Sequence, residues 1–176
     1  MRMKNYLTID IGRNWLRYAL ISEEIDVYKT GKEELNSFTS REDLFTTIKK
    51  ITDSFSSRTD SLAITMPGII DTDSGMAYSA GIYRFIRNEP LAKEISEYTG
   101  MKTIILNDAK AAALAEVGYG SLKGVHTGVM VMILGTGIGG AVIHDGKIFN
   151  GAHFGAGEFS YLTDSTQRAA DNSDMF

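Results

Sequence analysis

The sequence contains no cysteine, and this excludes disulfide bonds and metal sites built from thiolates. Its histidines have neither the HxxxH nor the HExxH spacing of zinc-binding pairs; there are three, His126, His144 and His153. We therefore expect no structural zinc ion.

Long hydrophobic runs are also missing. No stretch approaches the roughly 20 apolar residues that span a bilayer, and the N-terminus lacks the apolar segment and cleavage site of a signal peptide. Basic residues are not in excess, since 18 Lys and Arg stand against 22 Asp and Glu and the net charge is −4. Such a chain offers no basic surface for nucleic acid. We expect a cytoplasmic protein that binds neither membranes nor nucleic acid.

Apolar residues make up 43% of the 176-residue chain, enough for one ordinary domain or two small ones. In the first third, runs rich in β-branched and aromatic residues predict an antiparallel meander with strands at 6–11, 15–21 and 25–30. Ser40 then gives an N-cap signal, and apolar residues recur behind it at helical spacing. This pattern predicts a helix that ends near Ser57.

The middle of the chain alternates strand and helix patterns, whereas the last third has only strand patterns. Strands are predicted at 61–66, 102–106, 128–134, 141–144 and 147–149, and helices at 91–98 and 109–117. This order predicts an α/β fold whose first unit spans residues 1–119. Residues 120–176 are predicted to form the opening strands of a second unit, without the helices that would cover its sheet.

Two glycine-containing turns each allow two interpretations. Residues 135–140 read GTGIGG, so successive backbone N–H groups could cradle a phosphate, or the segment is a glycine-rich hairpin. It has neither the helix that follows a Rossmann fingerprint nor the Gly-Lys-Ser/Thr of a Walker loop. Residues 10–14 are either a phosphate-handling turn or a hairpin tip, because Gly12 and Asn14 both tolerate the positive φ of a tight turn.

Two acidic residues lie at positions where they could act in catalysis or in ligand binding. Asp108 opens a predicted helix directly after a strand, where a carboxylate is either an N-cap or a general base for an attacking hydroxyl. Glu158 lies among glycines, either as a solvated loop acid or as a carboxylate that grips paired sugar hydroxyls. His153 and Tyr161 near it either assist or pack.

Five elements in sequence order resemble the motifs of the ROK family of bacterial sugar kinases and repressors. They are DIGRN (10–14), MPGIID (66–71), NDAKAAALAE (107–116), LGTGIGGAVIHDGKI (134–148) and GAHFGAGEFSY (151–161). The resemblance implies the ribonuclease H-like fold of the actin-like ATPase superfamily, with a first lobe complete or nearly so and a truncated second lobe. Many members have histidine at the position of Tyr161, and many have a cysteine cluster that this chain lacks. In both respects the chain resembles the zinc-free branch of the family, which includes β-glucoside kinases.

The resemblance also implies an activity, the ATP-dependent phosphorylation of the 6-hydroxyl of a hexose or hexoside by a homodimer. It makes Asp108 the catalytic base. The residues implied to bind the sugar are Asn107, Glu158 and His153. Those implied to line the ATP phosphates are Gly135, Thr136, Gly137 and Gly139. The first phosphate turn would contain Asp10, Gly12, Arg13 and Asn14, with Asp10 near Mg²⁺.

Two departures from the family pattern leave other functions open. Arg13 and Asn14 replace a glycine and a threonine, and the arginine either blocks backbone approach to phosphate or pairs with it. The chain is also shorter than typical members. The alternatives to a kinase are a non-catalytic sugar-binding or regulatory relative and a truncated chain without independent activity. A DNA-binding repressor is disfavoured, because the first motif begins within ten residues of the start.

Overall fold

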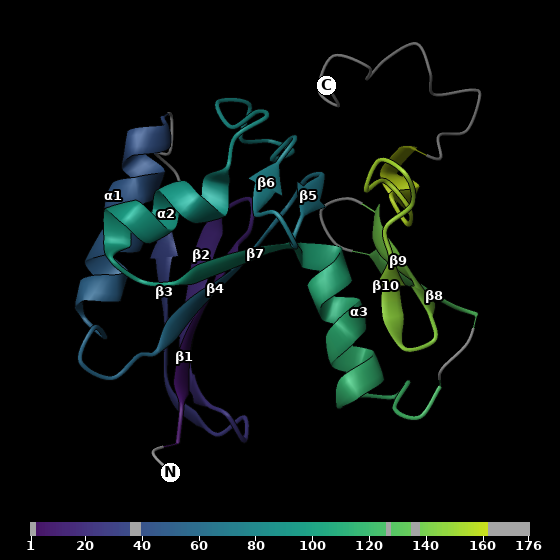
Figure 1. Cartoon of the computed structure of the whole chain (residues 1–176), viewed down its shortest axis with the longest axis horizontal. Coiled ribbons are helices and arrows are strands. Elements are labelled where there is room, and N and C mark those ends of the chain that lie inside the picture. Colours follow the sequence, from purple (N-terminus) through teal and green to yellow (C-terminus); the bar gives the residue numbers. More distant parts are fainter. Residues whose placement is uncertain (1–2, 36–39, 126–127, 135–137, 162–176) are drawn as a thin grey trace. The chain divides into compact units, whose positions relative to one another are not determined.

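The computed structural model describes residues 3–35, 40–125, 128–134 and 138–161 (Figure 1). Its contacts divide the chain into two compact units, Met1–Leu106 and Asn107–Phe176, which are described separately below. This division groups the helix after residue 107 with the second unit. The predicted lobe boundary at residue 119 stays a prediction.

The first unit contains a five-stranded sheet with the strand order β3-β2-β1-β4-β7. Its first three strands form the predicted antiparallel meander, and β4 then pairs with β1 in parallel. The strands are β1 (Asn5–Ile11), β2 (Trp15–Ser22), β3 (Val27–Glu34), β4 (Ser61–Met66) and β7 (Thr103–Asn107). The two faces of β1 differ, because Leu7, Ile9 and Ile11 are buried in the core and alternate with more polar positions.

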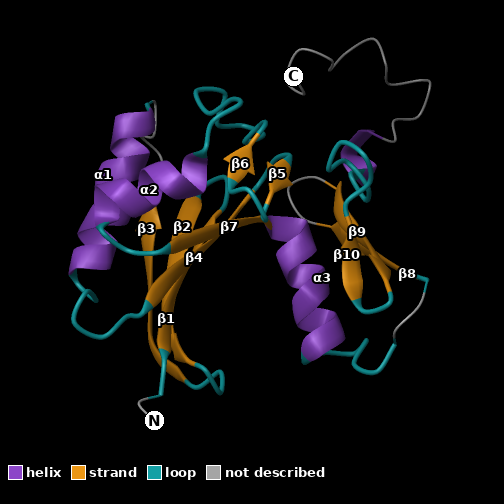
Figure 2. Cartoon of the chain, in the orientation of Figure 1, coloured by secondary structure: helices purple, strands orange, loops and turns teal. Residues whose placement is uncertain are grey.

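Two helices, α1 (Arg41–Asp53) and α2 (Leu91–Thr99), share one hydrophobic core with the sheet (Figure 2). Leu44 and Ile48 of α1 are fully buried, as the helical spacing predicts. The expected end of α1 near Ser57 is wrong. The helix ends at Asp53, and the N–H of Phe55 then bonds the carbonyl of Thr52 in a tighter turn.

The N-terminus of α1 carries the predicted Ser40 cap in the form of a capping box. The Ser40 hydroxyl accepts the Asp43 N–H at 3.2 Å, and the Asp43 carboxylate accepts the Ser40 N–H at 3.1 Å. We expect Ser40→Ala to lower the free energy of unfolding by about 1 kcal/mol, measured by urea denaturation. Ser40→Thr retains a capping hydroxyl and should keep most of that stability, so an equal loss in both variants would contradict the capping role.

The turn at residues 12–14 connects the antiparallel strands β1 and β2. Gly12 and Asn14 tolerate a positive φ, but neither adopts one. A close approach explains the glycine instead, because a Cβ atom at Gly12 would lie 3.2 Å from the carbonyl oxygen of Trp15. The N–H of Gly12 donates to that same oxygen at 3.0 Å.

A two-stranded hairpin follows the Pro67-Gly68 turn and was not expected from the sequence. It consists of β5 (Ile70–Asp71) and β6 (Met76–Ala77). Strands of two residues are too short to show an alternating pattern. Gly68 is required here, since its φ is +119° and a Cβ atom would lie 2.1 Å from the Ser79 carbonyl oxygen.

The second unit contains one helix, a three-stranded sheet of order β10-β9-β8 and a short 3₁₀ turn in its described part. These elements are α3 (Asp108–Gly118), β8 (Val129–Leu134), β9 (Ile138–His144), β10 (Lys147–Phe149) and η1 (Phe159–Tyr161). Strand β9 begins three residues before the predicted Ala141, so Gly139 and Gly140 are in a strand rather than a turn. The strands predicted at 141–144 and 147–149 form an antiparallel hairpin, whose turn residues Asp145 and Gly146 have φ values of +50° and +70°.

In the described residues, helix α3 covers one face of the sheet of the second unit, and the other face is covered only in part, where the Phe159 ring packs on Gly140. Ala113 of α3 packs on Ala141 and Ile143, so the prediction that no helix covers this sheet is wrong for that face. On the opposite face Met132 and Leu134 are 55% and 77% exposed. None of the helices in the described ranges is long and apolar enough to cross a membrane.

Candidate active site

The first cluster of functional side chains lies in the second unit, at the start of α3. Asn107 is the N-cap, and its buried side chain accepts the N–H of Lys110 at 3.0 Å. Asp108 follows as the first helical residue rather than the cap, and its half-buried carboxylate accepts the Ala109 N–H at 2.8 Å. The helix dipole stabilises a negative charge at this position. The side chain of Asp108 is therefore fixed in the first turn of the helix.

Lys110, which the sequence analysis did not identify, is the most buried charged residue of this cluster. Its side chain is 1% exposed, although lysine is almost never fully buried without partners. The ammonium donates to the Asn150 side-chain oxygen at 3.2 Å and to the Phe154 carbonyl at 2.7 Å. Burial lowers the pKa of Lys110, and the negative charge of Glu158 acts in the opposite direction.

Glu158 directly follows the loop of residues 150–157 and is half-buried. Burial raises the pKa of its carboxyl group, the charge of Lys110 opposes this rise, and the charge of Asp108 adds to it. The two carboxylates and one ammonium therefore influence one another within a single compact unit. A carboxyl group with a raised pKa beside a second carboxylate is typical of a functional site.

The raised pKa of Glu158 predicts a specific pH dependence of stability. The folded state holds the Glu158 proton to higher pH than the unfolded chain does. Stability due to this group is therefore present at low pH and lost as the pH rises through the raised pKa. In Glu158→Gln this decline should disappear, which urea denaturation at a series of pH values would show. Glu24→Gln, at an exposed position, should retain the decline, and an unchanged profile in Glu158→Gln would contradict the assignment.

The other predicted binding residues of the second unit are His153 and members of the glycine-rich segment 135–140. His153 is exposed on the loop of residues 150–157. Gly135, Thr136 and Gly137 lie outside the described residues. Gly139 packs beneath α3, because a Cβ atom there would lie 2.9 Å from the Ala109 Cβ. That contact accounts for the glycine without a ligand, and its predicted contact with phosphate stays a prediction.

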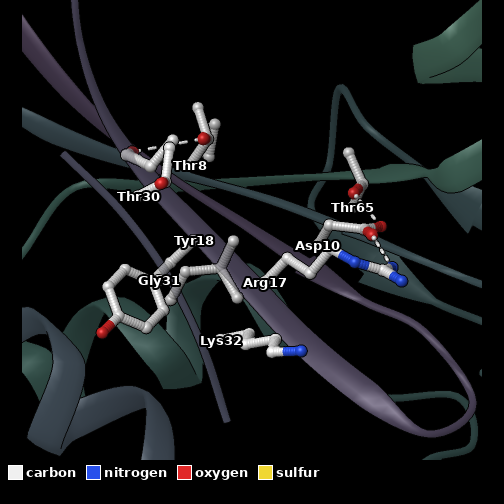
Figure 3. A pocket seen from close by; sticks show the side chains of 11 residues that line it. Thr8, Asp10, Arg17, Tyr18, Thr30, Gly31, Lys32 and Thr65 are labelled. Carbon is white, nitrogen blue, oxygen red and sulfur yellow. Dashed lines mark hydrogen bonds and ion pairs between the residues drawn. The ribbon is translucent and has the colours of Figure 1, made fainter. Parts of the chain in front are cut away.

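The second cluster lies in the first unit, on the sheet face that carries the polar positions of β1. Asp10 accepts the Thr65 hydroxyl at 2.9 Å and pairs with Arg17 at 3.5 Å, as Figure 3 shows. These three residues contribute to a cavity of about 670 Å³ on this sheet. Arg13 and Asn14 are exposed and do not line the cavity.

A buried tyrosine holds the turn beside Asp10. The Tyr83 hydroxyl donates to the carbonyl of Gly12, and the side chain is 5% exposed. Burial and the nearby Asp10 charge raise the pKa of Tyr83 to about 12. The hydroxyl therefore remains a donor at neutral pH and fixes the backbone after Asp10.

Among these residues, Asp10 has the side chain that could ligate a magnesium ion. Asp10 is the second-last residue of β1, and its side chain is 45% exposed. Mg²⁺ commonly takes one or two carboxylates together with water and substrate phosphates. Within the described ranges no group of three or more His, Cys, Asp or Glu side chains could hold a metal ion. The predicted contact of Asp10 with Mg²⁺ would therefore need further ligands from water and substrate phosphates, and it stays a prediction.

Comparison with known proteins gives consistent matches. The model of the ROK family matches residues 6–167. A β-glucoside kinase of Klebsiella pneumoniae is 31% identical over 87% of the chain and 50% of its own length. A glucokinase of Halalkalibacterium halodurans is 28% identical over 90% of the chain and 49% of its own length. The chain thus spans about half the length of these curated relatives.

A solved structure supports the fold. The ROK family glucokinase from Streptomyces griseus, in complex with glucose and AMPPNP, matches 88% of this chain with a TM-score of 0.76 and 27% identity. The match covers 49% of that glucokinase. The predicted α/β fold of the actin-like ATPase type is confirmed, as is the prediction that the chain corresponds to part of such a protein.

Proposed function

Since the chain belongs to the ROK family, we propose that it contributes the base and sugar-binding residues of an ATP-dependent kinase acting on the 6-hydroxyl of a hexose or hexoside. The relatives named as glucokinase and β-glucoside kinase support this substrate class. The complex of the Streptomyces griseus relative with glucose and AMPPNP supports binding of both a sugar and a nucleotide.

One observation carries the proposal, namely that the charge of Asp108 acts on the carboxyl group of Glu158. Asp108 is fixed at the start of α3, and Glu158 is half-buried and within electrostatic reach of it. Two carboxylates with different surroundings can take different roles. We assign Asp108 to the proton of the attacking hydroxyl and Glu158 to neighbouring sugar hydroxyls.

The chemistry assigned to these residues is in-line phosphoryl transfer. The oxygen of the sugar 6-hydroxyl forms a bond to the γ-phosphorus while Asp108 accepts the hydroxyl proton, and the bond between the γ-phosphorus and ADP breaks. Glu158 orients the sugar by accepting hydrogen bonds from its hydroxyls, so the reacting oxygen is positioned before transfer. Mg²⁺ held by Asp10 would supply positive charge to the phosphate oxygens.

A second candidate, a non-catalytic sugar-binding relative, is favoured by the surroundings of Asp10. Both carboxylate oxygens already have partners, Thr65 at 2.9 Å and Arg17 at 3.5 Å. A guanidinium paired with the proposed metal ligand weakens binding of Mg²⁺ and nucleotide more than binding of sugar.

A coupled ATP and hexose assay, together with calorimetric titration of glucose and AMPPNP, separates the candidates. Turnover with binding of both ligands would support the kinase. Glucose binding without AMPPNP binding would support the regulatory relative. Binding of neither would overturn both for this chain.

A further inference from the structure

The strongest observation outside the assigned chemistry is the buried ammonium of Lys110. Its partners Asn150 and Phe154 both belong to the loop that precedes Glu158, and they lie 40 and 44 residues away along the chain. The lysine comes from α3, and the loop follows β10. One side chain therefore connects the helix that carries Asp108 to the loop that ends at Glu158.

The loop needs such support because its backbone is strained. Phe154 has a φ of +60°, a value that residues other than glycine rarely adopt. Its carbonyl oxygen is the acceptor of the shorter Lys110 hydrogen bond, at 2.7 Å. The loop is closed by the Ala156 N–H, which donates to the Asn150 carbonyl at 3.1 Å. Strained backbone persists where the surrounding contacts over-determine it.

We propose that Lys110 is a positioning residue, which fixes the loop of residues 150–157 and thereby sets the position of the Glu158 carboxylate. The positioning of the loop does not depend on the proposed function. Only the effect on sugar binding rests on it. Lys110 itself is too buried to touch a substrate, since it is 1% exposed. It acts through Asn150, Phe154 and its positive charge.

The test compares Lys110→Gln with Lys123→Gln, a neutralised exposed lysine of the same unit. In Lys110→Gln we expect amide exchange of Ala156 and Glu158 to accelerate at least about tenfold, because the loop loses its charged anchor. The NMR titration of the Glu158 side-chain carbon should move to higher pH, since the opposing charge of Lys110 is gone. A weakened loop without a charge effect would leave that titration in place. Neither readout should change in Lys123→Gln.

Calorimetry with glucose adds the functional measurement. We expect affinity to fall at least about tenfold in Lys110→Gln and to recover in part in Lys110→Arg, which keeps the charge. If the unaltered chain binds no glucose while exchange and titration change as expected, positioning holds and the proposed function fails. If Lys110→Gln folds with both readouts unchanged, positioning is overturned.

A second variant covers the case in which Lys110→Gln does not fold. Asn150→Ala removes one acceptor and keeps the lysine and its bond to Phe154. It should accelerate the exchange of Ala156 while leaving the amides of α1 protected. Unchanged exchange in this variant would also overturn the proposal.

Discussion

Asp108→Asn is expected to lower the rate of the proposed phosphoryl transfer by about 10²- to 10⁴-fold, the usual contribution of a general base. Asparagine has nearly the same shape, and its side-chain oxygen can still accept the Ala109 N–H that Asp108 accepts at 2.8 Å. The fold should therefore survive while the proton acceptor is lost. The coupled assay gives the rate, and calorimetry with glucose should show a nearly unchanged affinity.

The control for this variant is Asp73→Asn, which makes the same chemical change at an exposed turn of the first unit. It should leave the rate unchanged. The Glu158 titration gives an independent measure, because loss of the Asp108 charge should move it to lower pH. An Asp108→Asn enzyme with the original rate would remove Asp108 from the mechanism.

Gly157→Ala should have the largest effect on stability. The φ of Gly157 is +87°, and a Cβ atom would lie 2.6 Å from the Cα and 2.9 Å from the nitrogen of Ala141. Backbone atoms of a central strand cannot move aside cheaply. Unfavourable φ and overpacking each cost about 1–3 kcal/mol, so the second unit should lose most of its stability. Urea denaturation and the exchange of β9 amides would measure the loss.

A matched control lies two residues away. Gly155 has no atom within 4 Å of a Cβ atom built on it, and its φ is not in the positive range. Gly155→Ala should therefore change the free energy of unfolding by less than about 0.5 kcal/mol. Equal losses in the two variants would mean that the loop as a whole, rather than the contact at Ala141, determines the stability.

Elements with strong local signals were predictable from the sequence. The helix predicted at 91–98 is α2, and Gly100 after it forms a left-handed cap with a φ of +75°. The strands predicted at 141–144 and 147–149 are likewise present, joined by Asp145-Gly146. The start of β9 was not predictable, because glycines usually mark turns. Gly139 and Gly140 occupy a strand because side chains there would clash with Ala109 and Phe159.

The two acids of the candidate site were identified from the sequence, whereas the lysine that contacts its loop was not. Asp108 and Glu158 were singled out by position and motif, both belong to one unit, and their roles stay a proposal. Lys110 was missed because a lysine in an alanine-rich helix suggests a solvated side chain. Its burial depends on Asn150 and Phe154, which lie far along the chain, and no local pattern encodes such a contact.

The hydrogen bond between Lys110 and Asn150 also affects how these two positions can evolve. The ammonium and the amide oxygen lie 3.2 Å apart in a buried setting, so losing either partner leaves the other unsatisfied. A first substitution at one position is costly, and a second at the other position recovers part of that cost. Positions 110 and 150 should therefore change together among descendants of this gene, as a coupled pair under joint selection.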